Sequence, residues 1–213
     1  MMKALIYKDF SSLKKSIMIL LAIIFLLCLY FVLYFGKEQL LFIPMIFTFG
    51  ESILLKTAFV IDYKYDIDKY LVATGIKKDK IVLSRYTMVF LASILAMGFG
   101  LFIHFLFARN ISMSIFLILA IIFFITSFIG SIELPLIYKF GIEKINIVFT
   151  VFYLFVVVLF SVIANKQDFI AGLIRRGLSI NENTLALAIS LFTLLMLGLS
   201  IGISIKIYQK KEF

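Results

Sequence analysis

SIMILLAIIFLLCLYFVLYF, residues 16–35, contains no charged residue and is long enough to cross a membrane as one helix. A transmembrane helix needs roughly 20 apolar residues, because the hydrocarbon core is about 30 Å thick and each residue adds about 1.5 Å. Five further stretches are comparably long and apolar: residues 40–60, 86–107, 112–137, 145–164 and 184–205. We therefore predict an all-α, polytopic membrane protein with six transmembrane helices, built as a single membrane domain over residues 1–213.

The composition of the chain supports this class. Apolar residues make up 63% of the 213 residues, charged residues make up 15%, and the mean hydropathy is +1.14. Globular domains average about 45–50% apolar and about 25% charged residues. These values exclude a nucleic-acid-binding domain, and nucleic acid as a partner, despite a pI of about 9.6. Cys28 is the only cysteine, so an internal disulfide is excluded as well.

The net charge of +9 is distributed unevenly along the chain. Lysine and arginine concentrate in residues 3–15, 64–85, 139–144 and 206–211, which six spans would place on one side of the membrane. Because short basic loops stay in the cytoplasm, both termini and the 62–85 loop are expected there.

Two segments outside the spans have helical spacing of their apolar residues. Near the N-terminus, Ile6, Phe10 and Leu13 alternate with lysines, which predicts a short helix in the interface with membrane lipid. A basic anchor without a helix is the alternative. Residues 165–183 favour a helix at the outer surface or, equally, a plain surface loop.

The longest cytoplasmic loop, DYKYDIDKYLVATGIKKDKIVLSRY (62–86), has the pattern of a short amphipathic helix. Asp66 or Asp68 can cap its first turn, Gly75 can end it in the left-handed conformation, and Asp79 can cap the helix that follows. One face is expected to contact a protein partner, and a solvated charged loop is the alternative. That face comprises Ile67, Tyr70, Leu71 and Thr74, and the whole contact region adds Asp66, Asp68, Lys69, Gly75, Lys77 and Lys78.

Three charged residues fall within predicted spans, where each costs about 2.5–3.5 kcal/mol to insert. Glu51 and Lys56 lie in the second span and Glu133 lies in the fourth. Because these two spans run in the same direction, we predict that Lys56 pairs with Glu133. Pairing of Lys56 with Glu51, or extension of its ammonium group to the lipid headgroups, remains open. A structural ion pair is favoured over a substrate or proton path.

No motif of a known enzyme or metal site is present. The chain lacks the GxxxxGK[ST] phosphate loop, the GxSxG and HExxH motifs and any Cys/His cluster. Asp62, Asp66 and Asp68 lack the glycine and terminal glutamate of a calcium loop, so we interpret them as caps and solvated charges. Accordingly, no catalytic, cofactor-binding or metal-ligating residue is predicted in this chain.

Three segments resemble those of ABC type-2 permeases, the membrane halves of bacterial ABC exporters: LIYKDF (5–10), AFVIDYKYDIDKYLVATGIKKDKIVLSRY (58–86) and ELPLIYKFGIEK (133–144). The chain departs from the family at Thr74-Gly75, where a proline is usual. Small relatives include permeases that export phenol-soluble modulins and permeases that give immunity to lantibiotics. The resemblance implies a multi-pass protein of the bacterial plasma membrane.

The resemblance also implies partners. ATP and Mg²⁺ would bind to a separate ABC ATPase, present as two copies, so this chain would hold no cofactor. A second permease copy or a paralogue is expected, because six helices cannot enclose a peptide-sized path. The implied substrate is amphipathic or hydrophobic, a peptide moved out of the cytoplasm or inner leaflet. The alternative function is the substrate-binding component of an energy-coupling-factor vitamin importer, although the first span lacks the A-x-x-x-A pattern of those proteins.

Overall fold

The computed structural model describes residues 2–35, 42–107, 115–151 and 181–211, and every regular element within these ranges is a helix. The labelled helices are α1 (Met2–Phe35), α2 (Phe42–Lys64), α3 (Ile67–Ala73), α4 (Lys78–Phe107), α5 (Ile115–Phe140) and α8 (Glu182–Gln209). Residues 142–151 are also helical. The predicted all-α class is confirmed for the described residues.

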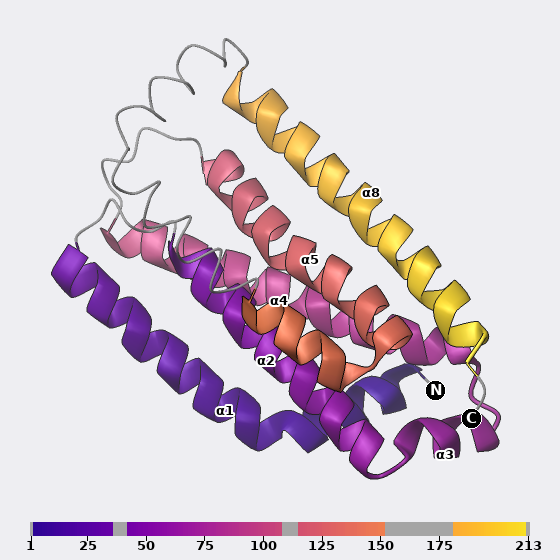
Figure 1. Ribbon diagram of the computed structural model, residues 1–213. Coiled ribbons are helices and arrows are strands. Elements are labelled where there is room, and N and C mark those ends of the chain that lie inside the picture. Colours follow the sequence, from indigo (N-terminus) through magenta and orange to yellow (C-terminus); the bar gives the residue numbers. More distant parts are fainter. Residues whose placement is uncertain (1, 36–41, 108–114, 152–180, 212–213) are drawn as a thin grey trace.

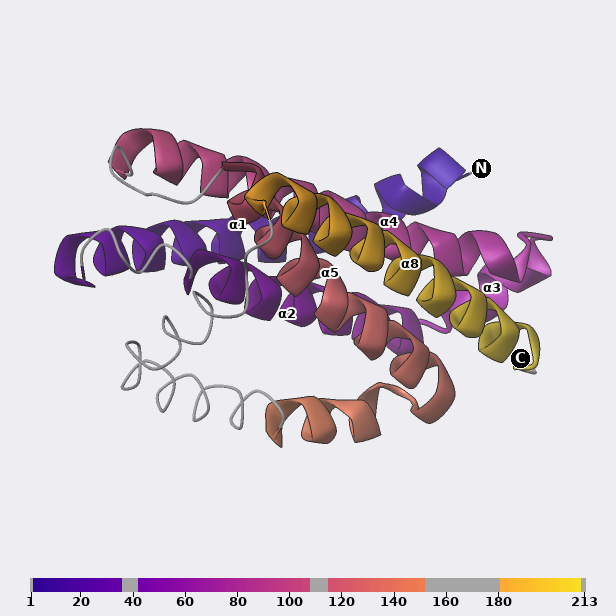
Figure 2. The same ribbon diagram turned by 90° about the horizontal axis from the view of Figure 1, so that it is seen from above.

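The long helices lie side by side in one bundle (Figure 1). α5 packs against α2, α4 and α8, and α1 packs against α2 and α4. Figure 2 shows that α3, the first turns of α1 and the C-terminal end of α8 all lie at one end of the bundle. The segments predicted to be cytoplasmic therefore share one end, which is called the basic end below.

Four helical segments within the described residues are long and apolar enough to cross a membrane: Ala4–Leu27, Lys78–Phe102, Ile115–Phe140 and Glu182–Gln209. They correspond to the predicted first, third, fourth and sixth spans, and α2 covers most of the predicted second span. The fifth span lies outside the described residues after residue 151, as does most of the outer segment at 165–183. The six-span topology and its orientation therefore stay predictions.

α1 differs in detail from the predicted N-terminal segment. Helix assignment continues without a break from Met2 to Phe35, although Figure 1 shows the first turns at an angle to the remainder. Leu5, Asp9 and Leu13 face the bundle, whereas Phe10 is 38% exposed. The inward face thus consists of residues four apart, beginning at Leu5. The polar Asp9 can lie on this face because it has a buried partner on α4. Placement of this segment at a lipid interface stays a prediction.

The caps of the short helix were predicted only in part. Gly75 ends α3 with a φ of 78°, and its amide and that of Ile76 donate to carbonyls of the last turn. Asp66 precedes α3, but its side chain makes no capping hydrogen bond and its own φ is 50°. Asp79 does not cap the next helix either, since α4 begins one residue earlier, at Lys78.

Hydroxyl groups join the helices where they cross. The Tyr86 hydroxyl of α4 lies 2.5 Å from Ser200 Oγ and 2.8 Å from Ser204 Oγ, both on α8. Ser93 Oγ of α4 lies 3.0 Å from Ser127 Oγ of α5. Such interhelical hydrogen bonds are typical of helices in lipid, where each contributes about 0.6–2 kcal/mol. They fix α4, α5 and α8 relative to one another.

The outer faces of α1 and α8 are apolar. Exposed side chains on α8 include Leu187, Leu191, Phe192, Leu194, Leu195, Leu199 and Ile203. A contiguous exposed apolar surface of this kind is unsuited to water and suits a lipid environment. The bundle therefore has the surface of a membrane protein, with its charged groups gathered elsewhere.

Candidate functional site

α3 projects from the basic end of the bundle and has no buried residue. Tyr70 is 69% exposed, and Lys69 beside it forms an exposed ion pair with Asp66 at 2.8 Å. Tyr63 and Tyr65, which precede α3, are also exposed. Exposed tyrosines of this kind are enriched where one protein contacts another.

The contact face predicted from the sequence requires correction. Leu71 and Val72 are partly buried and pack against the main hydrophobic core, whereas Tyr70 points to solvent. Consecutive helical residues differ by about 100° in direction, so Tyr70 and Leu71 cannot share a face here. The outward residues are Lys69, Tyr70 and Ala73, with Thr74 exposed beyond the last turn.

Asp68 lies on the inward side of α3, close to Tyr208 of α8. Burial raises the pKa of the Asp68 carboxyl, the charge of Asp62 raises it further, and the neighbouring cations Arg85 and Lys211 lower it. Tyr208 is fully buried, and its ring lies 5.1 Å from that of Tyr138 of α5. Asp68 and these two tyrosines thus place α3 beside the buried ends of α5 and α8.

The start of α4 is tied to the end of α8. Lys78 Nζ donates to the carbonyl oxygens of Gln209, at 3.1 Å, and Lys211, at 2.6 Å. Gln209 Nε2 in turn donates to Asp79 Oδ1 at 2.8 Å. A lysine at a helix C-terminus satisfies free carbonyls and interacts favourably with the helix dipole. Of the residues predicted to contact a partner protein, Lys78 and Asp68 instead face other helices of this chain, whereas Lys77 is exposed.

A buried ionic cluster lies beneath α3 and joins three helices. Arg85 of α4 pairs with Asp9 of α1, at 3.1 Å between Nη1 and Oδ1, and with Asp62 of α2. Lys8 Nζ lies 3.0 Å from an oxygen of each aspartate. Asp62 is therefore a buried ion-pair partner, which corrects its interpretation as a cap or solvated charge.

Sequence reasoning missed this cluster because its members come from three separate helices. Asp9, Asp62 and Arg85 are all at most 5% exposed. Two aspartates opposite one arginine and one lysine give a locally neutral set, which is the condition under which buried charges are tolerated. Lys8 and Asp9 belong to a segment that resembles the family, but no local pattern in the sequence identifies Arg85 or Asp62 as their partners.

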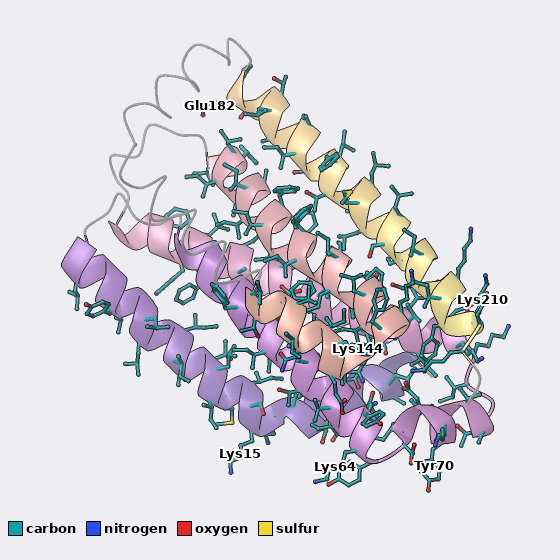
Figure 3. All side chains as sticks on the ribbon, in the orientation of Figure 1. Lys15, Lys64, Tyr70, Lys144, Glu182 and Lys210 are labelled. Atoms are coloured by element: carbon teal, nitrogen blue, oxygen red, sulfur yellow. The ribbon has the colours of Figure 1, made fainter. Side chains whose placement is uncertain are left out.

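A cavity of about 750 Å³ opens between the end of α2, α3 and the end of α5. Its lining mixes aromatic, acidic and basic side chains: Phe59, Asp62, Tyr63, Lys64, Asp66, Asp68, Lys69, Ile137, Tyr138, Phe140, Gly141, Ile142, Glu143, Lys144 and Lys211. Figure 3 shows Lys15, Lys64, Lys144, Lys210 and Tyr70 towards the basic end, with Glu182 at the opposite end. The cavity therefore adjoins α3 on the most charged part of the bundle.

Within the bundle, Lys56 reaches Glu133 rather than Glu51. Lys56 Nζ lies 3.5 Å from Glu133 Oε1, and Ser52 Oγ donates to the same oxygen at 2.9 Å. Glu133 is fully buried. Glu51 is also buried, and neither of its carboxyl oxygens has a hydrogen-bond partner among the described residues. The predicted pair is thus present, and Glu51 lies apart from it.

In the part of the chain that the structure describes, no group of three or more His, Cys, Asp or Glu side chains could hold a metal ion.

Comparison with known proteins decides the class of this protein. A family model described as ABC-2 family transporter protein matches residues 4–209. The chain belongs to this family. No curated protein and no solved structure matches the chain.

As an ABC-2 family member, the protein is the membrane permease of an ABC transporter and works with an ABC ATPase subunit. The match covers nearly the whole chain and favours the permease over the vitamin-importer component considered from sequence. The family consists of membrane transport subunits. The α3 region of this permease is therefore the first place to look for contact with the ATPase.

Proposed function

We propose that this permease exports an amphipathic or hydrophobic peptide from the cytoplasm or the inner leaflet. The proposal is supported by the resemblance of three segments to small exporter permeases and by the apolar outer faces of α1 and α8. An amphipathic peptide partitions into the interface of a membrane, where such faces are accessible to it. Transport would follow alternating access or lateral clearance between two permease halves.

The ATPase docks on α3. The single observation that carries this assignment is the division of α3 into an outward side with Lys69 and Tyr70 and an inward side attached to the core through Leu71. An aromatic side chain that is 69% exposed beside a lysine suits insertion into a groove of a partner. The adjoining cavity of about 750 Å³ could accept a projecting element of the ATPase.

Nucleotide-driven closure of two ATPase subunits then moves α3 as a rigid body. The packing of Leu71 against the core cluster that contains Tyr208, with Asp68 beside it, passes this movement to the core and to α8. Lys78, bound to the last carbonyls of α8, makes α4 move with it. A second copy of the chain or a paralogue supplies the opposite wall of the path, and ATP and Mg²⁺ bind on the ATPase.

Reconstitution tests the proposed function. The permease and its co-purified ABC ATPase are placed in lipid nanodiscs, and ATP hydrolysis is measured with and without an amphipathic helical peptide. We expect the peptide to stimulate hydrolysis and Tyr70→Glu to abolish this stimulation, while Lys15→Glu, an exposed change on α1, leaves it intact. Peptide stimulation that survives Tyr70→Glu would overturn the docking assignment, and absence of stimulation by any amphipathic peptide would overturn the substrate class.

A further inference from the structure

Glu51 occupies an unusual position in the bundle. It lies on α2, is 6% exposed, and both of its carboxyl oxygens lack a hydrogen-bond partner among the described residues. Most buried polar groups in proteins are hydrogen-bonded, and each exception requires an explanation. Glu133, on the facing helix, differs in having both Ser52 and Lys56 as partners.

The surroundings of Glu51 are closely packed and apolar. A Cβ atom built on Gly130 of α5 would lie only 2.9 Å from Glu51 Oε1 and 2.8 Å from Val89 of α4. On the α1 side, Leu20 and Ile24 pack against Gly50, the residue before Glu51. Contact this close leaves no room for a hydrated cation between the carboxyl group and α5, whereas a proton needs no additional space.

The titratable groups facing Glu51 are few. Among the described residues, Glu133 of α5 is the charged group that acts on Glu51, and the ammonium group of Lys56 lies 3.5 Å from Glu133. Leu20 and Ile24 of α1 lie against Gly50, and Val89 of α4 lies against Gly130, and none of these three side chains titrates. Glu133 is therefore paired with Lys56, whereas Glu51 has a second carboxyl group near it and no cation among these neighbours.

Charge balance follows from this arrangement. An ionised carboxylate buried without donors costs several kcal/mol, and a second negative charge nearby increases that cost. One proton on Glu51 makes the set of Glu51, Lys56 and Glu133 neutral and leaves the Lys56–Glu133 pair intact. The neutral acid also tolerates the close approach of Gly130.

We propose that Glu51 is a proton-binding site inside the permease. The site is occupied when α2 is packed against α5, and separation of these helices admits water and releases the proton. Proton release would thus accompany the opening of the α2–α5 contact. This inference does not depend on the identity of the transported substrate.

Infrared spectroscopy of the permease in dodecyl maltoside, a detergent that has no carbonyl group, tests the proposal directly. A protonated carboxylic acid has a carbonyl stretching band that an ionised carboxylate lacks. At about pH 7, we expect this band in the wild type, its loss in Glu51→Gln, and its retention in Glu143→Gln, which alters an exposed glutamate. A wild-type spectrum without the band, or a band that Glu51→Gln leaves unchanged, would overturn the proposal.

A titration of the wild type covers the case in which Glu51→Gln does not fold. The band should persist from about pH 6 to about pH 8 while the protein remains folded, because the site is closed to water. Disappearance of the band over that range in folded protein would contradict a buried proton site. Loss of the band in Glu133→Gln, with retention in Glu51→Gln, would assign the proton to Glu133 and would also refute the proposal.

Discussion

Arg85 of α4 and Asp9 of α1 form a buried ion pair, with 3.1 Å between Nη1 and Oδ1 and 2% exposure of each side chain. The pair holds the N-terminal turns of α1 against the start of α4, directly beneath α3. Because Asp62 of α2 shares the same guanidinium group, three helices meet at this one residue. The contact gives α3 a rigid base from which movement can be transmitted.

Removal of this guanidinium group should destabilise the bundle strongly. Arg85→Met leaves Asp9 and Asp62 buried without their main partner, which costs about 3–5 kcal/mol. The measurement is thermal or denaturant unfolding in detergent. Lys69→Ala breaks only the exposed pair with Asp66 and should leave stability unchanged. Equal stability losses in the two variants would show that the buried cluster does not hold the helices together.

The Lys56–Glu133 pair should behave as a coupled unit. Lys56→Glu or Glu133→Lys alone places two like charges together inside the bundle and should reduce the yield of folded protein. The double exchange restores opposite charges at the same separation and should recover folding, as measured by monodisperse protein on size-exclusion chromatography. Failure of the double exchange to improve on either single variant would argue against the pair.

Gly130 should not tolerate a side chain. A Cβ atom there would lie 2.8 Å from Val89 and 2.9 Å from Glu51, so Gly130→Ala forces α5 away from α2 and α4. Overpacking of this kind costs about 1–3 kcal/mol in unfolding experiments. Gly202→Ala on α8 is the matched control, because no atom lies within 4 Å of its Cβ position. The idea of a close α2–α5 contact is wrong if both variants unfold alike.

The two sides of α3 should respond differently to the same substitution. Leu71→Glu puts a charge against the main hydrophobic core and should lower the thermal unfolding temperature. Tyr70→Glu, one residue earlier, is on the solvent side and should leave that temperature unchanged. A thermal shift assay in detergent compares them, and a reversed order would require α3 to be rotated about its axis.

Asp68 should make stability depend on pH. Burial raises its pKa above the value in the unfolded chain, so its contribution to stability is complete below about pH 4 and is lost as the pH rises through the folded-state pKa. Asp68→Asn removes this loss. The variant should therefore gain stability relative to the wild type as the pH increases in a thermal unfolding series. A difference that is constant with pH would mean that Asp68 titrates as in water.

Much of the fold was predictable because hydropathy and helix length are local properties. Segments such as α5 and α8 were located within a few residues, since the bilayer dictates their length. The end of α3 at Gly75 was equally predictable, because the left-handed backbone conformation that often follows a helix favours glycine. The inward direction of Leu71 was not predictable from the sequence, because it depends on how α3 packs against the core.

Interactions between distant segments were predictable only where the spans constrained them. Lys56 and Glu133 could be paired because both lie in spans, where depth limits the choice of partner. Arg85, Asp9 and Asp62 lie near the ends of spans. There, water is as plausible a partner for each charge as another side chain is. Their burial follows from the way α1 crosses α4, which no local pattern specifies.

If an ABC ATPase drives this permease through α3, as we propose, the ATPase contacts the outward side of α3. Site-specific photo-crosslinking tests it most directly, with a photoreactive amino acid placed at Tyr70 or, as a control, at Leu187, an exposed position in the N-terminal half of α8. We predict a covalent adduct between permease and ATPase from position 70 and none from position 187. No adduct from position 70 in a complex that still hydrolyses ATP, or equal adducts from both positions, would contradict the claim.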